Sequence, residues 1–342
     1  MNVVAMCTVS TGLTAIKFAL DMGVKIQKVI GLDNIPNRNQ DAISGVIDIA
    51  SFCYANDLDF DYVSDYSLKT ETPKILGEDI DLIWVCNWQR LLPCSFIKAA
   101  KLAVVGAHGS CDGITKGRGR SPQNWALMIG AENFEISLFK LTLGVDDGEV
   151  IASGEFELTP TDTINSSYLK ASFLVAEMIA QVYAKPSLLD LAEKQTGEVS
   201  YFPKRTPSDG AIDWTMSAKD INNQIRALAP PYPNSFSIFK GTKFFITKSL
   251  PIDIKATYTA GEVVELMDDK SFLVACHDGL LLVSDYHVER GSIIPAPRSK
   301  FESVSINKTA NKIYSRFKTE FPDKAVNQTL LNFWSRNDVK LI

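Results

Sequence analysis

The feature that most constrains the fold of this chain is the alternation of short apolar runs with helix-like segments in its first half. The segments between the runs have helical spacing, as at residues 48–56, where apolar side chains recur on one face. Strands that alternate with helices are typical of a parallel α/β sheet. We predict strands in four of the runs, at residues 2–9, 24–32, 81–86 and 102–107.

Two further strands are expected before residue 200. Residues 135–141 and 149–158 have the apolar content of neighbouring strands, joined by an Asp-Asp-Gly turn. Residues 166–184 then predict a long amphipathic helix. These segments complete a first domain, which we place at residues 1–200.

The pattern changes beyond a linker rich in proline and basic residues. A short helix is expected at residues 219–228, and residues 235–288 break into short alternating strands. Such strands are typical of a small open β-barrel. We therefore expect a barrel domain over residues 201–300 and a helical extension over residues 301–342.

Charge and composition argue against several classes of function. The net charge of −5 disfavours a broad nucleic-acid surface, which needs clustered positive charge. The six cysteines form no CxxC pair, as expected of reduced thiols in the cytoplasm. The N-terminal residues lack the basic region of a signal peptide, and no apolar run is long enough to span a membrane. We expect a cytoplasmic protein with neither nucleic acid nor membrane as a partner.

The segment from Val104 to Asp147 carries most of the chemical information. It contains one of the chain's three histidines, His108, at the end of an apolar run. A basic glycine turn follows, and Ser121-Pro122 then predicts a helix start with serine as the cap. Gly130 is the expected stop of that helix. The segment closes on a pair of carboxylates in a glycine-flanked turn.

This ordered set resembles the active-site segment of the 10-formyltetrahydrofolate-dependent formyltransferases. That family has a His-Gly-Ser or His-Pro-Ser element, an Arg-Gly turn, a Pro-x-x-Trp helix and a Gly-x-Asp-x-Gly loop. The matching residues here are His108-Gly109-Ser110, Arg118-Gly119-Arg120, Pro122 with Trp125, and Gly144-Val145-Asp146-Asp147-Gly148. The likeness covers residues 80–245 well, and its linker and barrel motifs are similar to those of the branch that acts on nucleotide-sugar amines.

The resemblance implies a Rossmann-like formyltransferase domain followed by an open, OB-like β-barrel. It implies transfer of the formyl group of 10-formyltetrahydrofolate to the primary amine of a nucleotide-linked amino sugar, for surface polysaccharide synthesis, without a metal. A homodimer is left open. Two alternatives remain: a methionyl-tRNA formyltransferase, and a folate-binding homologue without catalysis.

By the same resemblance, His108 and Asp146 are the catalytic imidazole and carboxylate. Acyl transfer needs a donor for the developing oxyanion and a group that relays a proton near neutral pH, for which imidazole is suited. A carboxylate can orient that imidazole. Without the motif, a lone histidine is more often a hydrogen-bonded structural residue; we interpret His277 and His287 in that way.

The folate is expected along the loop at residues 87–93 and along the strand before the Asp146 turn. The implied cofactor-binding residues are Arg90, Leu91, Leu92, Leu138, Lys140, Leu141 and Thr142. Backbone groups hold the pterin in relatives, which leaves the side chains of this loop free to vary. Ordinary packing therefore remains an alternative role for Leu91 and Leu92.

The acceptor is expected near five residues: Ser10, Thr11, Ser110, Arg118 and Arg120. Ser10 and Thr11 follow the first strand, where α/β folds place ligands. The arginines precede a helix start, a position that suits phosphate; a solvated basic turn is the alternative.

One departure from the family is central. The family has Asn two residues before the histidine, whereas this chain has Gly106. Loss of one oxyanion donor can raise a barrier by about 2.7–4 kcal/mol. We expect His108 to be the direct donor, with a water held by Ser110 or by backbone near Gly106 completing the hole. Gly106→Asn should be tolerated, or speed the reaction, if the adjoining space is open and wet. The loop at residues 111–115 is also longer than in relatives.

Overall fold

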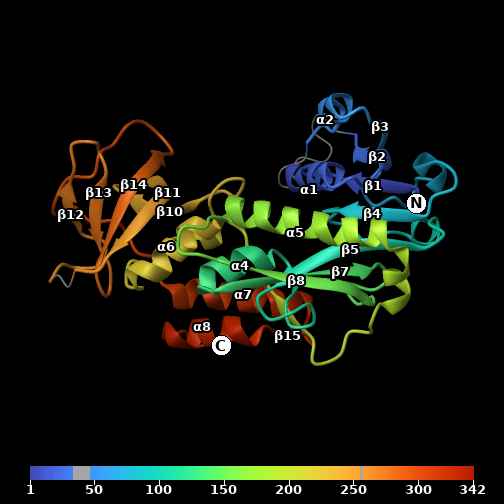
Figure 1. The fold of residues 1–342 in the computed structure, drawn as a ribbon. Helices are drawn as coiled ribbons and strands as arrows, with labels where there is room; N and C mark the ends of the chain where they lie inside the picture. The colour runs from blue at the N-terminus through green and yellow to red at the C-terminus, as the bar shows by residue number, and fades with distance from the viewer. Residues whose placement is uncertain (34–46, 255–256) are drawn as a thin grey trace. The chain divides into compact units, whose positions relative to one another are not determined.

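The computed structural model describes residues 1–33, 47–254 and 257–342 (Figure 1). They fold as two compact units. The first comprises residues 1–115, 133–157 and 167–198, and the second comprises residues 116–132, 158–166 and 199–342. These units differ from the contiguous segments 1–200, 201–300 and 301–342 expected from the sequence, because two short segments and the C-terminal helices fold with the barrel strands.

The first unit contains a seven-stranded sheet in the order β3-β2-β1-β4-β5-β7-β8 (Figure 1). The first five strands in this order are parallel, while β7 and β8 are antiparallel. The expected mostly parallel, Rossmann-like sheet is thus confirmed. Its strands are β1 (Val3–Cys7), β2 (Ile26–Leu32), β3 (Asp59–Val63), β4 (Leu82–Cys86), β5 (Ala103–Ser110), β7 (Asn133–Lys140) and β8 (Val150–Glu157).

Strands β1 and β4 form the centre of this sheet. All their residues are buried, as expected for parallel strands covered on both faces. The unit's helices are α1 (Ser10–Asp21), α2 (Ala50–Ala55), α3 (Cys94–Ile97), most of α5 (Ile164–Ala184), and the 3-10 turns η1 (Pro73–Leu76) and η2 (Pro186–Leu191).

Strand β5 is longer than its apolar run predicts. Its ladder with β7 continues to the pair Ser110–Glu135, so His108 lies within the strand, opposite Ser137. Antiparallel pairing with β7 extends β5 beyond the point where its parallel partner β4 ends.

The second unit contains a five-stranded antiparallel sheet in the order β10-β11-β14-β13-β12. Its strands are β10 (Ser235–Phe239), β11 (Thr242–Ile252), β12 (Val263–Leu266), β13 (Phe272–Ala275) and β14 (Leu280–Val288). Residues 298–302 connect its two edges: the Glu302 N–H donates to the Ile238 carbonyl (2.8 Å), and the Val263 N–H donates to the Ser299 carbonyl (2.8 Å). Phe301 is buried among Phe239, Phe244 and Phe272 and fills the interior.

The rest of the second unit is built from helices and a small sheet. The order of that sheet is β15-β9-β6. Residues 301–342, expected as a helical extension, contain α7 and α8 with β15 between them. The elements are β6 (Arg118–Gly119), α4 (Pro122–Ile129), β9 (Ser200–Phe202), η3 (Pro207–Gly210), α6 (Ala218–Ala227), α7 (Ile306–Glu320), β15 (Ala325–Val326) and α8 (Gln328–Arg336).

Helix α4 begins and ends where the sequence predicts, but its N-cap serine makes no capping bond. Pro122 begins the helix and Gly130 ends it, with φ 74°. Ser121 makes no side-chain capping bond, because its backbone is left-handed (φ 53°) rather than extended as a serine cap requires. Ser121 thus occupies the expected N-cap position, but without the side-chain bond that usually accompanies it.

No helix among the described residues is long and apolar enough to cross a membrane.

Candidate functional site

The two residues expected to be catalytic lie together in the first unit. His108 is on β5, and Asp146 is in the turn between β7 and β8. The Nδ1 atom of His108 is 3.7 Å from the Oδ2 atom of Asp146, and the two side chains are 13% and 26% exposed. This separation is longer than a hydrogen bond but short enough for attraction to a protonated imidazole. Both groups remain open to small molecules.

The turn at residues 141–148 determines which carboxylate faces the histidine. Asp147 accepts a hydrogen bond from the Thr142 hydroxyl and so belongs to the turn itself. The Gln195 side chain donates to the main-chain oxygens of Asp146 and Gly148, both at 2.9 Å. These bonds hold the Asp146 backbone at φ 51°, and the Asp146 carboxylate faces His108. Asp146 is thus the carboxylate nearer to His108, and its catalytic role stays a prediction.

Position 148 requires glycine because the main chain of Lys140 lies too close for a Cβ atom. A Cβ atom at Gly148 would lie 1.7 Å from the Lys140 carbonyl oxygen, which is a main-chain atom and cannot move aside cheaply. The glycine therefore allows the chain to return from the turn directly over the end of β7. Sequence reasoning identified this glycine as part of a motif but not its packing role.

The space beside Gly106 is occupied by a leucine side chain. A Cβ atom at Gly106 would lie 3.0 Å from Leu141 Cδ2, with two more atoms of that side chain within 3.5 Å. Gly106 is also paired with Val85 of β4 and Phe139 of β7. The Leu141 side chain packs there because β7 returns antiparallel to β5. The condition of an open, wet space for Gly106→Asn is thus not met at this point, and the roles of His108 and of a held water stay predictions.

The loop after β5 offers no nucleophilic thiolate. Burial raises the pKa of the Cys111 thiol to about 12, so the thiol is protonated near neutral pH. Ser110 is fully buried, and its hydroxyl oxygen accepts the Asp112 N–H at 3.0 Å. Direct contact of Ser110 with a substrate would need movement of this loop, and its substrate-binding role stays a prediction.

The residues expected to bind folate have different environments. Leu91 is exposed, Leu92 is buried in the core, and the Arg90 guanidinium lies 4.9 Å from the centre of the Tyr66 ring. Leu138 is fully buried, and the Lys140 ammonium pairs with Glu149 at 2.9 Å. Leu91 and Arg90 can therefore present side chains to a ligand, whereas Leu92 and Leu138 can contribute main-chain groups.

The start of α1 and the loop at residues 87–93 are bonded to each other. The Asn87 amide donates to the Thr11 hydroxyl (2.8 Å), and the Thr8 hydroxyl donates to the Asn87 carbonyl (3.2 Å). Ser10 is exposed at the same helix start. Sequence reasoning missed Thr8 and did not single out Asn87; an asparagine that ends an apolar run was the available signal.

The two arginines of the predicted phosphate turn belong to the second unit. Arg118 is on β6, paired with Tyr201, and is only 8% exposed. Arg120 is exposed, and its main-chain N–H donates to the Phe202 carbonyl at 3.1 Å. Of the two, Arg120 presents its guanidinium to solvent; the roles of both stay predictions.

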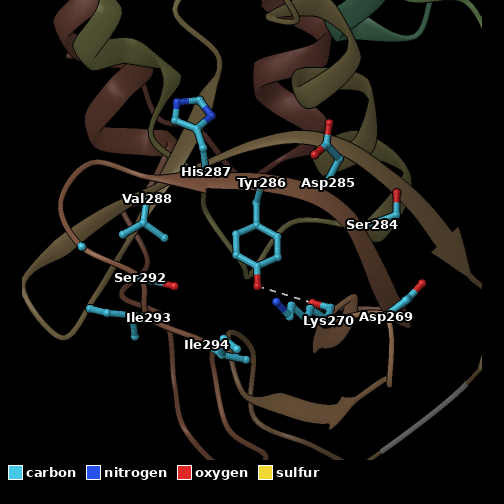
Figure 2. A pocket seen from close by; sticks show the side chains of 11 residues that line it. Asp269, Lys270, Ser284, Asp285, Tyr286, His287, Val288, Ser292, Ile293 and Ile294 are labelled. Atoms are coloured by element: carbon cyan, nitrogen blue, oxygen red, sulfur yellow. Dashed lines mark hydrogen bonds between the residues drawn. The ribbon is translucent and has the colours of Figure 1, made fainter.

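A hollow of about 340 Å³ also lies in the second unit, beside β14 (Figure 2). The Tyr286 side chain points toward Lys270, whose carbonyl accepts its hydroxyl at 3.4 Å (Figure 2). The His287 ring stacks on Phe245 with ring centres 4.8 Å apart, as expected of a structural histidine. None of the residues expected to be catalytic or ligand-binding lines this hollow.

The sequence matches two family models. The model of formyl transferase matches residues 66–183, and the model of the formyl transferase C-terminal domain matches residues 204–299. Together they span more than half of the chain.

One curated relative is the bifunctional polymyxin resistance protein ArnA of Wigglesworthia glossinidia brevipalpis. The chain is 32% identical to it over 191 residues, which are 54% of this chain and 28% of that protein. The chain therefore spans little more than a quarter of this relative's length.

Two solved structures share the fold. HypX from Aquifex aeolicus, in complex with tetrahydrofolic acid, superposes with a TM-score of 0.58 at 15% identity, covering 96% of this chain and 48% of that one. The N-formyltransferase from Helicobacter canadensis, in complex with folinic acid and dTDP-3-aminofucose, superposes with a TM-score of 0.57 at 17% identity, covering 84% and 100%.

Proposed function

Because the chain belongs to the formyl transferase family, we propose that it is an enzyme that moves the formyl group of 10-formyltetrahydrofolate to the primary amine of a nucleotide-linked amino sugar. The proposal is supported by the HypX and Helicobacter structures, which are complexes with folates, the second also with a nucleotide-linked amino sugar. A role in surface polysaccharide synthesis is part of the same proposal.

The pairing of His108 with Asp146 is the observation that carries this proposal. In the reaction, the amine nitrogen attacks the formyl carbon and negative charge builds on the formyl oxygen. The bond from that carbon to N10 of the folate then breaks. The amine loses a proton, and N10 gains one.

His108 is the side chain that can stabilise the oxyanion. We assign its imidazole N–H as the direct donor, since a charged donor is roughly twice as strong as a neutral one. Asp146 orients the ring and stabilises its protonated form. The amine proton then leaves to water or to Asp146.

Gly106 favours a second candidate function, a folate-binding protein without turnover. Position 106 supplies no side-chain donor, and Leu141 fills the adjoining space. Of the family's two side chains near the oxyanion, Asn and His, this chain keeps the histidine. In this second function, loss of the Asn donor raises the barrier too far for catalysis.

Two measurements separate the candidates. Calorimetry with 5-formyltetrahydrofolate tests the donor site, and absence of binding at millimolar ligand contradicts both functions. Incubation with 10-formyltetrahydrofolate and a panel of nucleotide-linked amino sugars, read by mass, tests turnover. Formylation of an amino sugar supports the proposal; faster formylation of initiator tRNA would instead make the chain a methionyl-tRNA formyltransferase.

A further inference from the structure

Tyr66 contacts three consecutive residues of the donor loop, which we define as residues 87–93. Its carbonyl accepts the indole N–H of Trp88 at 3.2 Å, and its hydroxyl oxygen accepts the main-chain N–H of Gln89 at 2.9 Å. Its ring lies 5.3 Å from the Trp88 ring and carries the Arg90 guanidinium 4.9 Å from its centre. One side chain thus fixes the main chain at one loop residue and the side chains on either side of it.

Tyr66 is itself held by an acidic turn, residues 64–71. The Asp65 carboxylate accepts from the main-chain N–H and the hydroxyl of both Ser67 and Thr70, at 2.7–3.0 Å. The Glu71 carboxylate accepts from the Ser64 hydroxyl and from the N–H groups of Ser64 and Asp65. These bonds favour the charged forms and lower the pKa of both carboxyls. The turn is therefore braced on both sides of Tyr66.

Burial anchors this assembly to the core. Tyr66, Trp88, Leu92 and Leu68 belong to one buried apolar cluster, and Leu68 adopts a left-handed backbone (φ 57°) to reach it. Strand residues such as Val4 and Ile83 belong to the same cluster, so the acidic turn and the donor loop both pack on the sheet. The loop's conformation therefore depends in part on the acidic turn, besides the bonds of Asn87 to Thr8 and Thr11.

This dependence matters for ligand binding. Leu92 is buried and Arg90 is half-buried, so the donor loop offers a ligand its main-chain groups and the exposed side chains of Asn87, Gln89 and Leu91. Main-chain recognition requires that each peptide plane is already oriented, because ordering the loop on binding would cost conformational entropy. The hydroxyl of Tyr66 fixes the peptide that precedes Gln89.

We propose that Tyr66 is a positioning residue for the formyl donor: it holds the donor loop in the conformation that binds folate, without touching the folate's reacting atoms. The inference rests on the proposed function, since it assigns the loop to that ligand. It makes the acidic turn part of the donor site, although no charged group of the turn needs to reach the ligand.

The test compares Tyr66→Phe with Tyr62→Phe as a matched control. Each substitution removes one phenolic hydroxyl from the first unit, but the Tyr62 hydroxyl donates to Asp48, away from the donor loop. In titrations with 5-formyltetrahydrofolate, Tyr66→Phe should weaken binding about 3- to 10-fold, the loss expected for one hydrogen bond. Tyr62→Phe should bind like the unaltered protein. Amide exchange at Gln89 should become faster in Tyr66→Phe alone.

The possible outcomes are distinct. If the unaltered protein fails to bind the folate, the proposed function is wrong. If the unaltered protein binds and Tyr66→Phe binds equally well, with unchanged exchange at Gln89, the positioning role of Tyr66 is wrong. Should Tyr66→Phe not fold, Glu71→Gln replaces it, because that change weakens the acidic turn and leaves Tyr66 whole; unchanged affinity there would equally overturn the inference.

Discussion

His108 and Asp146 approach within 3.7 Å. His108→Asn should lower turnover on the amine acceptor about 10²- to 10³-fold, because the charged donor to the formyl oxyanion is lost. Asp146→Asn should also slow turnover, and asparagine tolerates the φ of 51° at this position. Turnover and thermal unfolding are measured together. Near-normal turnover in either variant would remove that residue from the mechanism.

Cys111 lies three residues from His108 but is not expected to react. Burial raises the pKa of its thiol to about 12, so a thiolate is scarce at neutral pH. Cys111→Ser should therefore retain turnover within a few-fold, and iodoacetamide should modify the exposed Cys94 faster than Cys111. Inactivation that follows modification of Cys111 itself, mapped by mass spectrometry, would show that the thiol takes part.

The Leu141 side chain leaves little room for a side chain at Gly106, so variants at the two positions should affect each other's stability. Gly106→Asn should lower the free energy of unfolding by about 1–3 kcal/mol, because the new side chain overpacks against Leu141. Leu141→Ala in the same chain should recover much of that loss by opening space. Chemical denaturation of the two single variants and the double variant measures the coupling. Simple additivity would mean that the two positions do not compete for one space.

At the scale of elements, the turn between β7 and β8 places the carboxylate. Gly148→Ala should distort this turn, since the added Cβ atom would meet the Lys140 carbonyl at 1.7 Å. We expect lower turnover and a lower melting temperature, whereas Gly241→Ala, at a turn with no atom within 4 Å, should lose stability only through its positive φ. Equal turnover in the two variants would contradict the role of the β7–β8 turn.

The sequence predicts most elements but not how their neighbours reshape them. Apolar runs are sufficient to find β1, β2, β4 and the helix α6, because burial and periodicity are local. The extension of β5 and the packing of Leu141 on Gly106 depend on the antiparallel return of β7, which no local pattern specifies. Ser121 lies at the predicted N-cap position, but its left-handed backbone, which no local pattern indicates, accompanies the loss of the side-chain capping bond. The pairing of His108 with Asp146 followed from a motif, whereas Tyr66 lies in a segment with no motif.

At the scale of the molecule, the C-terminal residues are part of the second unit. The Trp334 ring packs edge-on against Trp125, and Arg336 pairs with Asp220, whose side chain is 12% exposed. Arg316 pairs with the buried carboxylate of Asp209. Removal of residues 301–342 should therefore expose aromatic surface and leave two carboxylates without their arginines, which is strongly destabilising. Thermal unfolding and limited proteolysis measure this; a truncated chain as stable and protease-resistant as the full one would contradict it.

Formyl transfer to a sugar amine is the central claim, and one competition measures it most directly. The chain receives 10-formyltetrahydrofolate with a panel of nucleotide-linked amino sugars and charged initiator tRNA in the same vessel, and products are identified by mass. We predict that one amino sugar gains a formyl group fastest, and that His108→Asn abolishes this gain while the variant still binds 5-formyltetrahydrofolate. Faster formylation of the tRNA, or folate binding with no formylated amine in the panel, would contradict the claim.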